Sequence, residues 1–177
     1  MILRINPNRM ELLRLRKRLT LAQRGHKLLQ DKLEEMMRRL LGLLKDMDTQ
    51  KTDFKEKTQS LLKDLLYCRI TSAKNNFEDA LSKIDAQVVL GVLTRRIMNV
   101  KVPEFEIKEL KIEKRYDFFK TSAQLDLAVA AAPEYIKSLL KLAQLLKTLE
   151  ILSFEIERTR RRVNALEYML IPSIQET

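Results

Sequence analysis

The chain has 177 residues, enough for one compact domain with a core, but only 3 glycines and 4 prolines with which to build turns. With 33% charged residues, it has the composition of long helices and coiled coils, and its net charge of +10 favours acidic partners without choosing between nucleic acid, anionic lipid and an acidic protein cavity. A single cysteine excludes an internal disulfide, and the lack of a membrane span or signal peptide predicts a soluble chain.

The first third of the chain predicts one long helix with a heptad seam. Apolar residues recur at alternating steps of three and four. These seam positions are Leu12, Leu15, Leu19, Ala22, His26, Leu29, Leu33, Met36, Leu40, Leu43 and Met47. Asn6 and Pro7 form a helix start signal, and the spacing continues to Cys68, which we expect to be a buried, inert thiol. The helix is expected over residues 6–70.

His26 is the only histidine in the chain, and it falls on the seam. A single polar seam residue often fixes the register of two helices. Only Glu167 is expected at the same level of the second helix, so we predict neither catalysis nor metal binding at His26. Beside it, Gly25 costs about 1 kcal/mol relative to alanine in a helix. Gly25 is either simply tolerated or needed for the close approach of another protein.

Residues 71–120 are expected to form a small α+β head. Helical spacing runs from Ala73 to Val88 and predicts a short helix. Residues 86–94, AQVVLGVLT, are apolar and rich in β-branched side chains, and residues 97–112 alternate. Pro103 and Glu104 are interpreted as a tight turn that joins two short strands.

A second seam predicts a helix over residues 121–171. It runs through Leu125, Ala128, Ala132, Tyr135, Leu139, Leu142, Leu146, Leu149, Leu152, Ile156, Thr159, Val163, Leu166 and Leu170. Thr121 and Gln124 fit a capping box at its start. We expect Pro133 to kink this helix without ending it, and Pro172 to kink or stop it before a tail over residues 172–177.

The predicted fold class is mainly α, a long antiparallel two-helix coiled-coil hairpin with a small α+β head containing a short β-hairpin. The favoured register places His26 near Leu166. It also places Asp31, Glu34 and Glu35 opposite the arginines at positions 158, 160, 161 and 162. Several such pairs can choose between registers that pack equally well.

Motifs at both ends of the chain resemble one family. NPNRMELLRLRKRLTLAQRGHKLLQDK at the start and TRRRVNALEYMLIPSIQET at the end are similar to the D subunit of the A/V-type rotary ATPases, as are TSAQLDLAV and IMNVKVPEFE between them. In that family the second helix continues several turns beyond the LIP motif, so the tail is expected to be shortened here.

The resemblance implies a central rotor axle that is cytoplasmic, as a peripheral part of a membrane-bound complex. Its implied partners are the A and B subunits of the catalytic hexamer, the F subunit, and a funnel-shaped subunit that links to the membrane rotor ring. It implies no catalytic residue, cofactor or metal, no nucleic-acid partner and no direct membrane insertion. The absence of a phosphate-binding loop from the sequence agrees with a chain that does not itself hydrolyse ATP.

Three groups of site residues follow from the resemblance and from the charge pattern. The hexamer end of the axle is expected to use Arg14, Arg18, Arg24, Gly25 and Lys27. The side facing the F subunit is expected to use Gln50, Phe54, Lys57, Leu61, Leu142 and Leu146, where polar Gln50 and Lys57 interrupt the first seam. The family motif comprises Arg160, Arg161, Asn164, Leu166 and Pro172.

Two other functions fit the composition. A basic coiled coil could bind nucleic acid, although the basic residues here lack aromatic stacking partners and a known reading motif. A coiled-coil scaffold, with its charges merely facing solvent, is the other alternative. The paired end motifs favour the axle over both.

Overall fold

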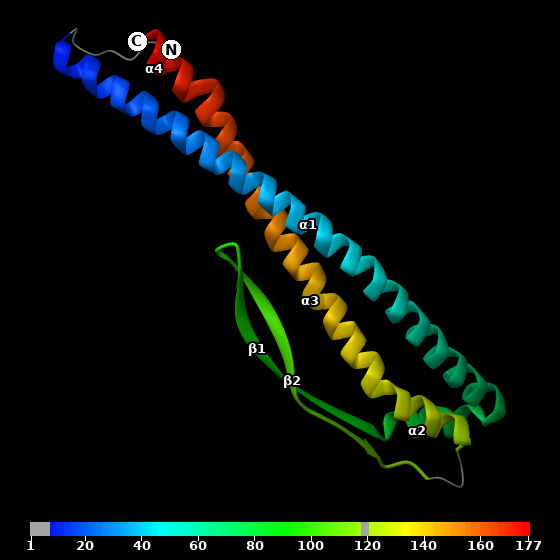
Figure 1. Cartoon of the computed structure of the whole chain (residues 1–177). Helices are drawn as coiled ribbons and strands as arrows, with labels where there is room; N and C mark the ends of the chain where they lie inside the picture. The colour runs from blue at the N-terminus through cyan, green and yellow to red at the C-terminus, as the bar shows by residue number, and fades with distance from the viewer. Residues whose placement is uncertain (1–7, 118–120) are drawn as a thin grey trace. The chain divides into compact units, whose positions relative to one another are not determined.

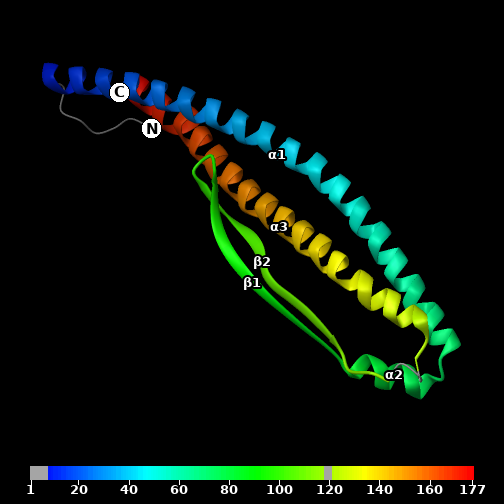
Figure 2. The same cartoon turned by 60° about the horizontal axis from the view of Figure 1, so that its bottom comes forward.

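The computed structural model describes residues 8–117 and 121–177, so the predicted start at Asn6 and Pro7 lies outside the described residues. The chain divides into two compact units. The first, residues 1–42 with 149–177, is here called the helix-pair unit, and the second, residues 43–148, is the hairpin unit. Helix α1 (Arg9–Thr71) and helix α3 (Ala123–Ala165) contribute to both units (Figures 1 and 2). Together with the two-stranded antiparallel sheet, they confirm the predicted fold class.

The first seam is confirmed by burial along α1 except at its first position, Leu12, which is 49% exposed. In the helix-pair unit Met36, a seam residue, is fully buried, whereas the adjacent Met37 is 40% exposed. On α3 of the same unit, the buried residues are Leu149, Leu152, Ile156, Thr159 and Val163, all of them predicted seam positions. Burial of these apolar side chains holds the two helical segments together.

The second seam is wrong in its middle part and at its last position, Leu170, which is 44% exposed. Leu139 and Leu146 are 40% and 50% exposed, whereas Ser138 and Thr148 are buried. A straight helix drifts by about 20° per heptad relative to a strict 3.5-residue repeat, so the buried face moves to neighbouring positions. The buried hydroxyls are satisfied within the helix, because Ser138 donates to the carbonyl of Tyr135 and Thr148 to that of Gln144.

The two prolines of the second helical region have different effects. Helix α3 continues through Pro133, so the prediction that no new helix begins there is confirmed. Ahead of Pro172, α3 gives way to a π-helix, η1 (Leu166–Leu170), followed by α4 (Ile171–Glu176). The N–H of Ile171 bonds to the carbonyl of Leu166, five residues back. Pro172 cannot donate to residue 168 and its ring crowds that carbonyl, and a wider turn accommodates both effects.

The helix of the head is shorter than predicted and the strands are longer. Helix α2 spans Lys74–Ser82, and the extended chain then begins at Ile84. Strand β1 (Ile84–Ile97) pairs antiparallel with strand β2 (Val100–Lys114). Ile84 and Val88 therefore belong to a strand, because their spacing fits a strand of period two as well as a helix.

The predicted turn at Pro103 and Glu104 is wrong. The chain turns at Met98 and Asn99, whose φ angles of 49° and 69° fit a two-residue type I′ hairpin turn. Pro103 lies inside β2 opposite Thr94. The N–H of Phe105, two residues on, points away from β1 and donates to Gln144 Oε1 at 3.0 Å. Pro103 shares that side of the strand, so its missing N–H costs no bond to β1.

The core of the hairpin unit joins both helices to the base of the hairpin. Its buried members are Cys68, Ala80, Tyr116, Leu125 and Val129. The hydroxyl of Tyr116 donates to Asp126 Oδ1 at 2.6 Å, and Lys114 Nζ donates to the same oxygen at 3.0 Å. Burial, followed by the bond to Asp126, raises the pKa of Tyr116 above its ordinary value.

The start of α3 is capped by a different residue from the one predicted. Ser122 precedes the helix, and its Oγ accepts the N–H of Gln124 at 3.4 Å and donates to the Gln124 side-chain oxygen. Thr121 instead donates to the carbonyl of Asp117. The predicted Thr121–Gln124 capping box is therefore wrong by one residue, and the serine that caps the helix is the more strongly preferred N-cap residue of the two.

Tyr116→Phe should lower the free energy of unfolding by about 1 kcal/mol, because the carboxylate of Asp126 loses a hydrogen bond. That bond, followed by the bond from Lys114, lowers the pKa of Asp126. A lowered carboxyl pKa stabilises the fold above the unfolded pKa of about 3.9, and this stabilisation is lost as the pH falls through the folded pKa. In urea denaturation, the variant should therefore lose less stability than the parent between about pH 5 and pH 2. Parallel pH profiles for the two proteins would contradict this.

Candidate partner-binding sites

The helix-pair unit contains an apolar groove between its helices. Residues of α1 line one side, and residues of η1 and α4 line the other. The lining residues are Leu15, Arg18, Leu21, Ala22, Gly25, Leu166, Leu170, Ser173 and Ile174, around a volume of about 520 Å³. Low numbers on α1 meet high numbers on α4, as antiparallel packing requires.

Gly25 keeps one wall of this groove open. A Cβ built on Gly25 would meet nothing within 4 Å, so packing within the chain does not require glycine here. Glycine at this position still weakens the helix relative to alanine. The free space above Gly25 is therefore accessible to another molecule.

One of the basic residues predicted for the hexamer end lines the groove, and the others are exposed on the same helix. Arg18 lines it, and Arg24 and Lys27 are exposed on the same helix. Arg14 is exposed and forms an ion pair with Glu11 at 2.6 Å. Exposed ion pairs of this kind contribute little to stability, so Arg14 can exchange Glu11 for a partner's carboxylate at small cost.

Two exposed leucines of α1, one of which lines the groove, were not predicted as site residues. Leu21 and Leu28 are 72% and 69% exposed, although both are large and apolar. They lie one heptad apart on a face of α1 outside the seam. Their position off the seam was the signal that could have found them, because a leucine that the partner helix does not cover marks a second apolar surface. The site thus combines an apolar groove with a basic margin.

The predicted register is confirmed at His26. Its Nε2 lies 3.5 Å from Glu167 Oε2, next to Leu166 in the helix-pair unit. The contact is too long for a good hydrogen bond, and Nε2 is buried without a hydrogen-bond partner. Within the described residues, no group of three or more His, Cys, Asp or Glu side chains could hold a metal ion.

The charged rows that were expected to face each other do not pair across the helices. Glu35 instead pairs with Arg38 at 3.6 Å, and Arg161 pairs with Glu157 on its own helix. Exposed side chains three or four residues apart on one helix meet without bridging to another element. Apolar packing on the seam, rather than interhelical ion pairs, therefore sets this register.

His26→Leu should raise the free energy of unfolding by about 1 kcal/mol, because it removes a buried nitrogen that lacks a hydrogen-bond partner and leaves an apolar seam residue. Urea denaturation measures the change. Gln23→Leu, on an exposed position of the same helix, is the control and should change stability by less than about 0.5 kcal/mol. Marked destabilisation by His26→Leu would show that the contact with Glu167 outweighs the cost of burying the nitrogen.

The family-motif residues have mixed positions. Leu166 lines the groove, and Pro172 lies in the first turn of α4. Arg160, Arg161 and Asn164 are exposed on α3. The motif thus supplies one residue of the groove lining and an exposed polar face.

The residues predicted to face the F subunit lie in the hairpin unit, and two of them pack within the chain. Phe54 stacks on Tyr135 with ring centroids 5.3 Å apart. Leu61 lines a small apolar cavity of about 170 Å³ together with residues of α3 and the hairpin. Gln50 and Leu142 are half-buried, and Leu146 is half-exposed. Leu139 and Leu146, exposed one heptad apart, give this site an apolar face that the seam interpretation had buried.

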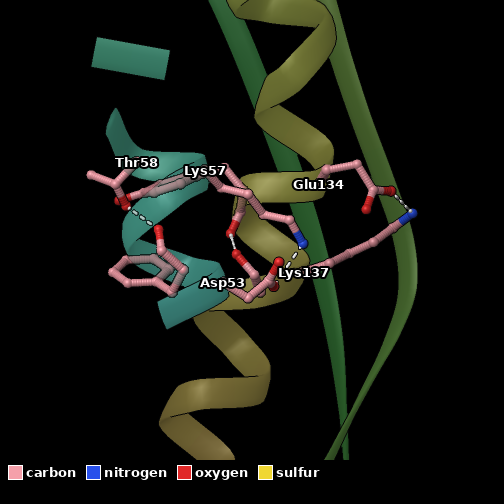
Figure 3. Close-up of polar contacts among 8 residues, drawn as sticks. Asp53, Lys57, Thr58, Glu134 and Lys137 are labelled. Carbon is pink, nitrogen blue, oxygen red and sulfur yellow. Dashed lines mark hydrogen bonds and ion pairs between the residues drawn. The ribbon is translucent and has the colours of Figure 1, made fainter. Parts of the chain in front are cut away.

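Charged groups surround this second site. Lys57 bonds to Asp53 at 2.8 Å, and Thr58 donates to the carbonyl of Phe54 (Figure 3). Lys137 donates to Glu134 at 2.9 Å, and this bond is the main cause that lowers the pKa of Glu134. The charge of Lys57 on α1 lowers it further. Each of these lysines is therefore paired with a carboxylate of its own helix.

The family model for the D subunit of ATP synthase matches residues 11–177. The chain belongs to the ATP synthase D-subunit family. A V-type ATP synthase D subunit from Clostridium novyi is 42% identical over 180 residues, which cover 99% of this chain and 83% of the relative. The corresponding D subunits of Clostridium botulinum and Acetivibrio thermocellus are 41% and 40% identical, over 100% and 99% of this chain and 84% and 81% of their own lengths.

Membership confirms the resemblance carried by the two end motifs. As a member of the D-subunit family, the chain is one component of an ATP synthase of this type. Among the described residues, no helix is both long and apolar enough to cross a bilayer.

Proposed function

We propose that this chain is the central stalk component, or rotor axle, of an A/V-type ATPase. In this role it transmits rotation between the catalytic A/B hexamer and the membrane rotor ring, without catalysing ATP hydrolysis itself. The family match over residues 11–177 carries the proposal. Residues 6–70 and 121–171 form the shaft, residues 71–120 the head and residues 172–177 the tail.

The helix-pair unit has properties that suit contact with the hexamer. Its seam residues are buried between two antiparallel segments, and a pair of packed helices resists bending better than a single helix. Its outer surface presents an apolar groove between α1 and the segment of η1 and α4, with Arg18 in its lining. An asymmetric surface presents a different face to each site of a surrounding ring. The rotational orientation of the axle is then coupled to the binding affinity of each of those sites. Arg14, Arg24 and Lys27 add long-range attraction that does not lock one orientation.

The hairpin unit supplies the remaining contacts in this proposal. The F subunit docks near Lys57 and the exposed pair Leu139 and Leu146, and the funnel-shaped subunit receives the head. Residues of α1 and α3 within the hairpin unit support this docking surface, namely Gln50, Phe54, Leu61 and Leu142. Crosslinks from the F subunit that are confined to residues 1–25 would contradict this assignment.

Reconstitution tests the proposal. Mixed with A/B hexamer and the F subunit, the chain should co-elute with both as one complex and change the rate of ATP turnover. The purified chain alone should hydrolyse no ATP above a mock preparation. Binding to the hexamer with unchanged turnover would contradict the coupling role, and ATP hydrolysis by the chain alone would contradict its non-catalytic nature.

A further inference from the structure

Strand β1 has one free edge. The sheet has two strands, and the outer edge of β2 faces α3, where Phe105 N–H donates to Gln144. In both views of the hairpin unit, β2 lies between β1 and α3 (Figures 1 and 2). Within the described residues, no strand pairs with the other side of β1. A further strand would therefore pair the backbone groups that this edge leaves free.

The backbone groups at that edge can be assigned from the ladder. Phe105 lies opposite Val92, and its N–H points away from β1, so the two form a non-hydrogen-bonded pair. The N–H and C=O of Val92 therefore also point outward. The bulge places its extra residue, Lys108, on β2, so alternation along β1 is unbroken. Val88, Leu90 and Thr94 thus present unpaired groups beside those of Val92.

The side chains along this edge do not protect it. Residues 86–94, AQVVLGVLT, contain no charge and no proline. Leu90 and Val92 are 43% and 64% exposed. Proteins usually guard an exposed edge strand with lysine, proline or a covering segment, and an unguarded apolar edge is a template for another strand.

The charges at the two ends of this segment indicate which strand would pair with the free edge of β1. Asp85 precedes the uncharged segment and Arg95 follows it, and neither has an ion-pair partner among the described residues. The nearby Arg115 donates its hydrogen bond to Glu113, which is the main cause that raises its pKa, and the charge of Asp85 contributes less. If two copies of β1 pair antiparallel about a two-fold axis at Leu90, Asp85 of each copy lies opposite Arg95 of the other.

This register is the one that both geometry and charge allow. Two residues directly opposite each other in an antiparallel pair either both point their N–H and C=O groups at the other strand or both point them away. Because this direction alternates along a strand, the two-fold axis must pass through a residue and not between two residues. An axis at Val89 or Gly91 would place Asp85 opposite Leu93 or Ile97 instead. Opposite charges directly across two strands stabilise the pair. The axis at Leu90 also points the outward backbone groups of Leu90 at their counterparts in the second copy.

We propose that, outside the ATPase, this chain forms a two-fold symmetric dimer in which the β1 edges of two copies pair antiparallel about Leu90. The result is a four-stranded sheet with β1 of both copies at its centre. The proposal concerns the free chain and does not depend on its role as a rotor.

Sedimentation velocity of the full chain over a range of concentrations tests this dimer. We expect the mass to rise from 20.8 kDa towards twice that value with concentration. Leu90→Lys places two like charges on the axis and should raise the dissociation constant by about tenfold or more. Leu127→Lys, at an exposed apolar position of α3, is the matched control and should leave it unchanged. A monomer at all concentrations up to about 1 mM would overturn the proposal.

A charge swap tests the register. Arg95→Glu should weaken the dimer because it faces Asp85 of the second copy, and Asp85→Arg should weaken it because it faces Arg95. The double variant D85R/R95E should restore dimerisation. Equal behaviour of the single and double variants, or a dimer weakened by Leu127→Lys and not by Leu90→Lys, would show that another surface joins the copies.

Discussion

Leu125→Ala should lower the free energy of unfolding by about 3 kcal/mol. The side chain of Leu125 is fully buried in the core of the hairpin unit, where it packs in the cluster that includes Cys68, Ala80 and Tyr116. Removing a buried leucine side chain costs the transfer free energy of the lost carbons and leaves a cavity, which together amount to about 2–5 kcal/mol. Urea denaturation followed by circular dichroism measures the change.

The control lies two residues away on the same helix. Leu127 is 61% exposed, so Leu127→Ala should change stability by less than about 0.5 kcal/mol. Alanine favours the helix at least as much as leucine at both positions, so propensity cannot produce the contrast. Equal losses for the two variants would mean that this face of α3 does not form the core described here.

Gly25→Leu should affect folding and partner binding in opposite directions. The free chain should gain up to about 1 kcal/mol in stability, because leucine is the better helix former and a Cβ at this position meets nothing within 4 Å. Binding to the A/B hexamer should weaken by about tenfold or more, because the side chain enters the groove beside Leu21 and Leu166. Urea denaturation and titration with the hexamer give the two values.

Gly42→Leu is the matched control for this prediction. Gly42 also lies inside α1, is exposed and has no atom within 4 Å of a built Cβ, but it does not line the groove. The control should show the same gain in stability with unchanged binding. If both variants bind the hexamer as tightly as the parent, the groove at Gly25 is not part of the contact.

Spacing in the sequence predicted the helices well because it is a local property of the chain. The alternation of three and four steps located the buried face of α1 from Leu15 to Cys68. His26 lies against Glu167, as the favoured register predicted, although the interhelical charge pairs that favoured this register do not form. The same spacing failed for Leu139 and Leu146, because a strict repeat ignores the rotation of the buried face along a straight helix.

The hairpin was harder to predict because its signals depend on partners. Pro103 is compatible with a strand only because its nitrogen faces α3, and nothing in the local sequence reports on which side a strand is paired. The true turn, Met98 and Asn99, has positive φ angles without a glycine to announce them. Likewise, the groove depends on contacts between the two ends of the chain. The sequence showed Gly25 as unusual, but the space beside it became visible only in the folded helix pair.

Direct observation of rotation tests the rotor proposal most directly. With the A/B hexamer fixed to a surface, a bead attached through Thr94→Cys, an exposed position of β1, would report the motion of this chain. The native Cys68 is buried and should not compete for the label. We predict that the bead turns in one direction when ATP is supplied and stops when ATP is removed. A bead that stays fixed relative to the hexamer while the hexamer hydrolyses ATP would contradict the proposal that this chain is the rotor.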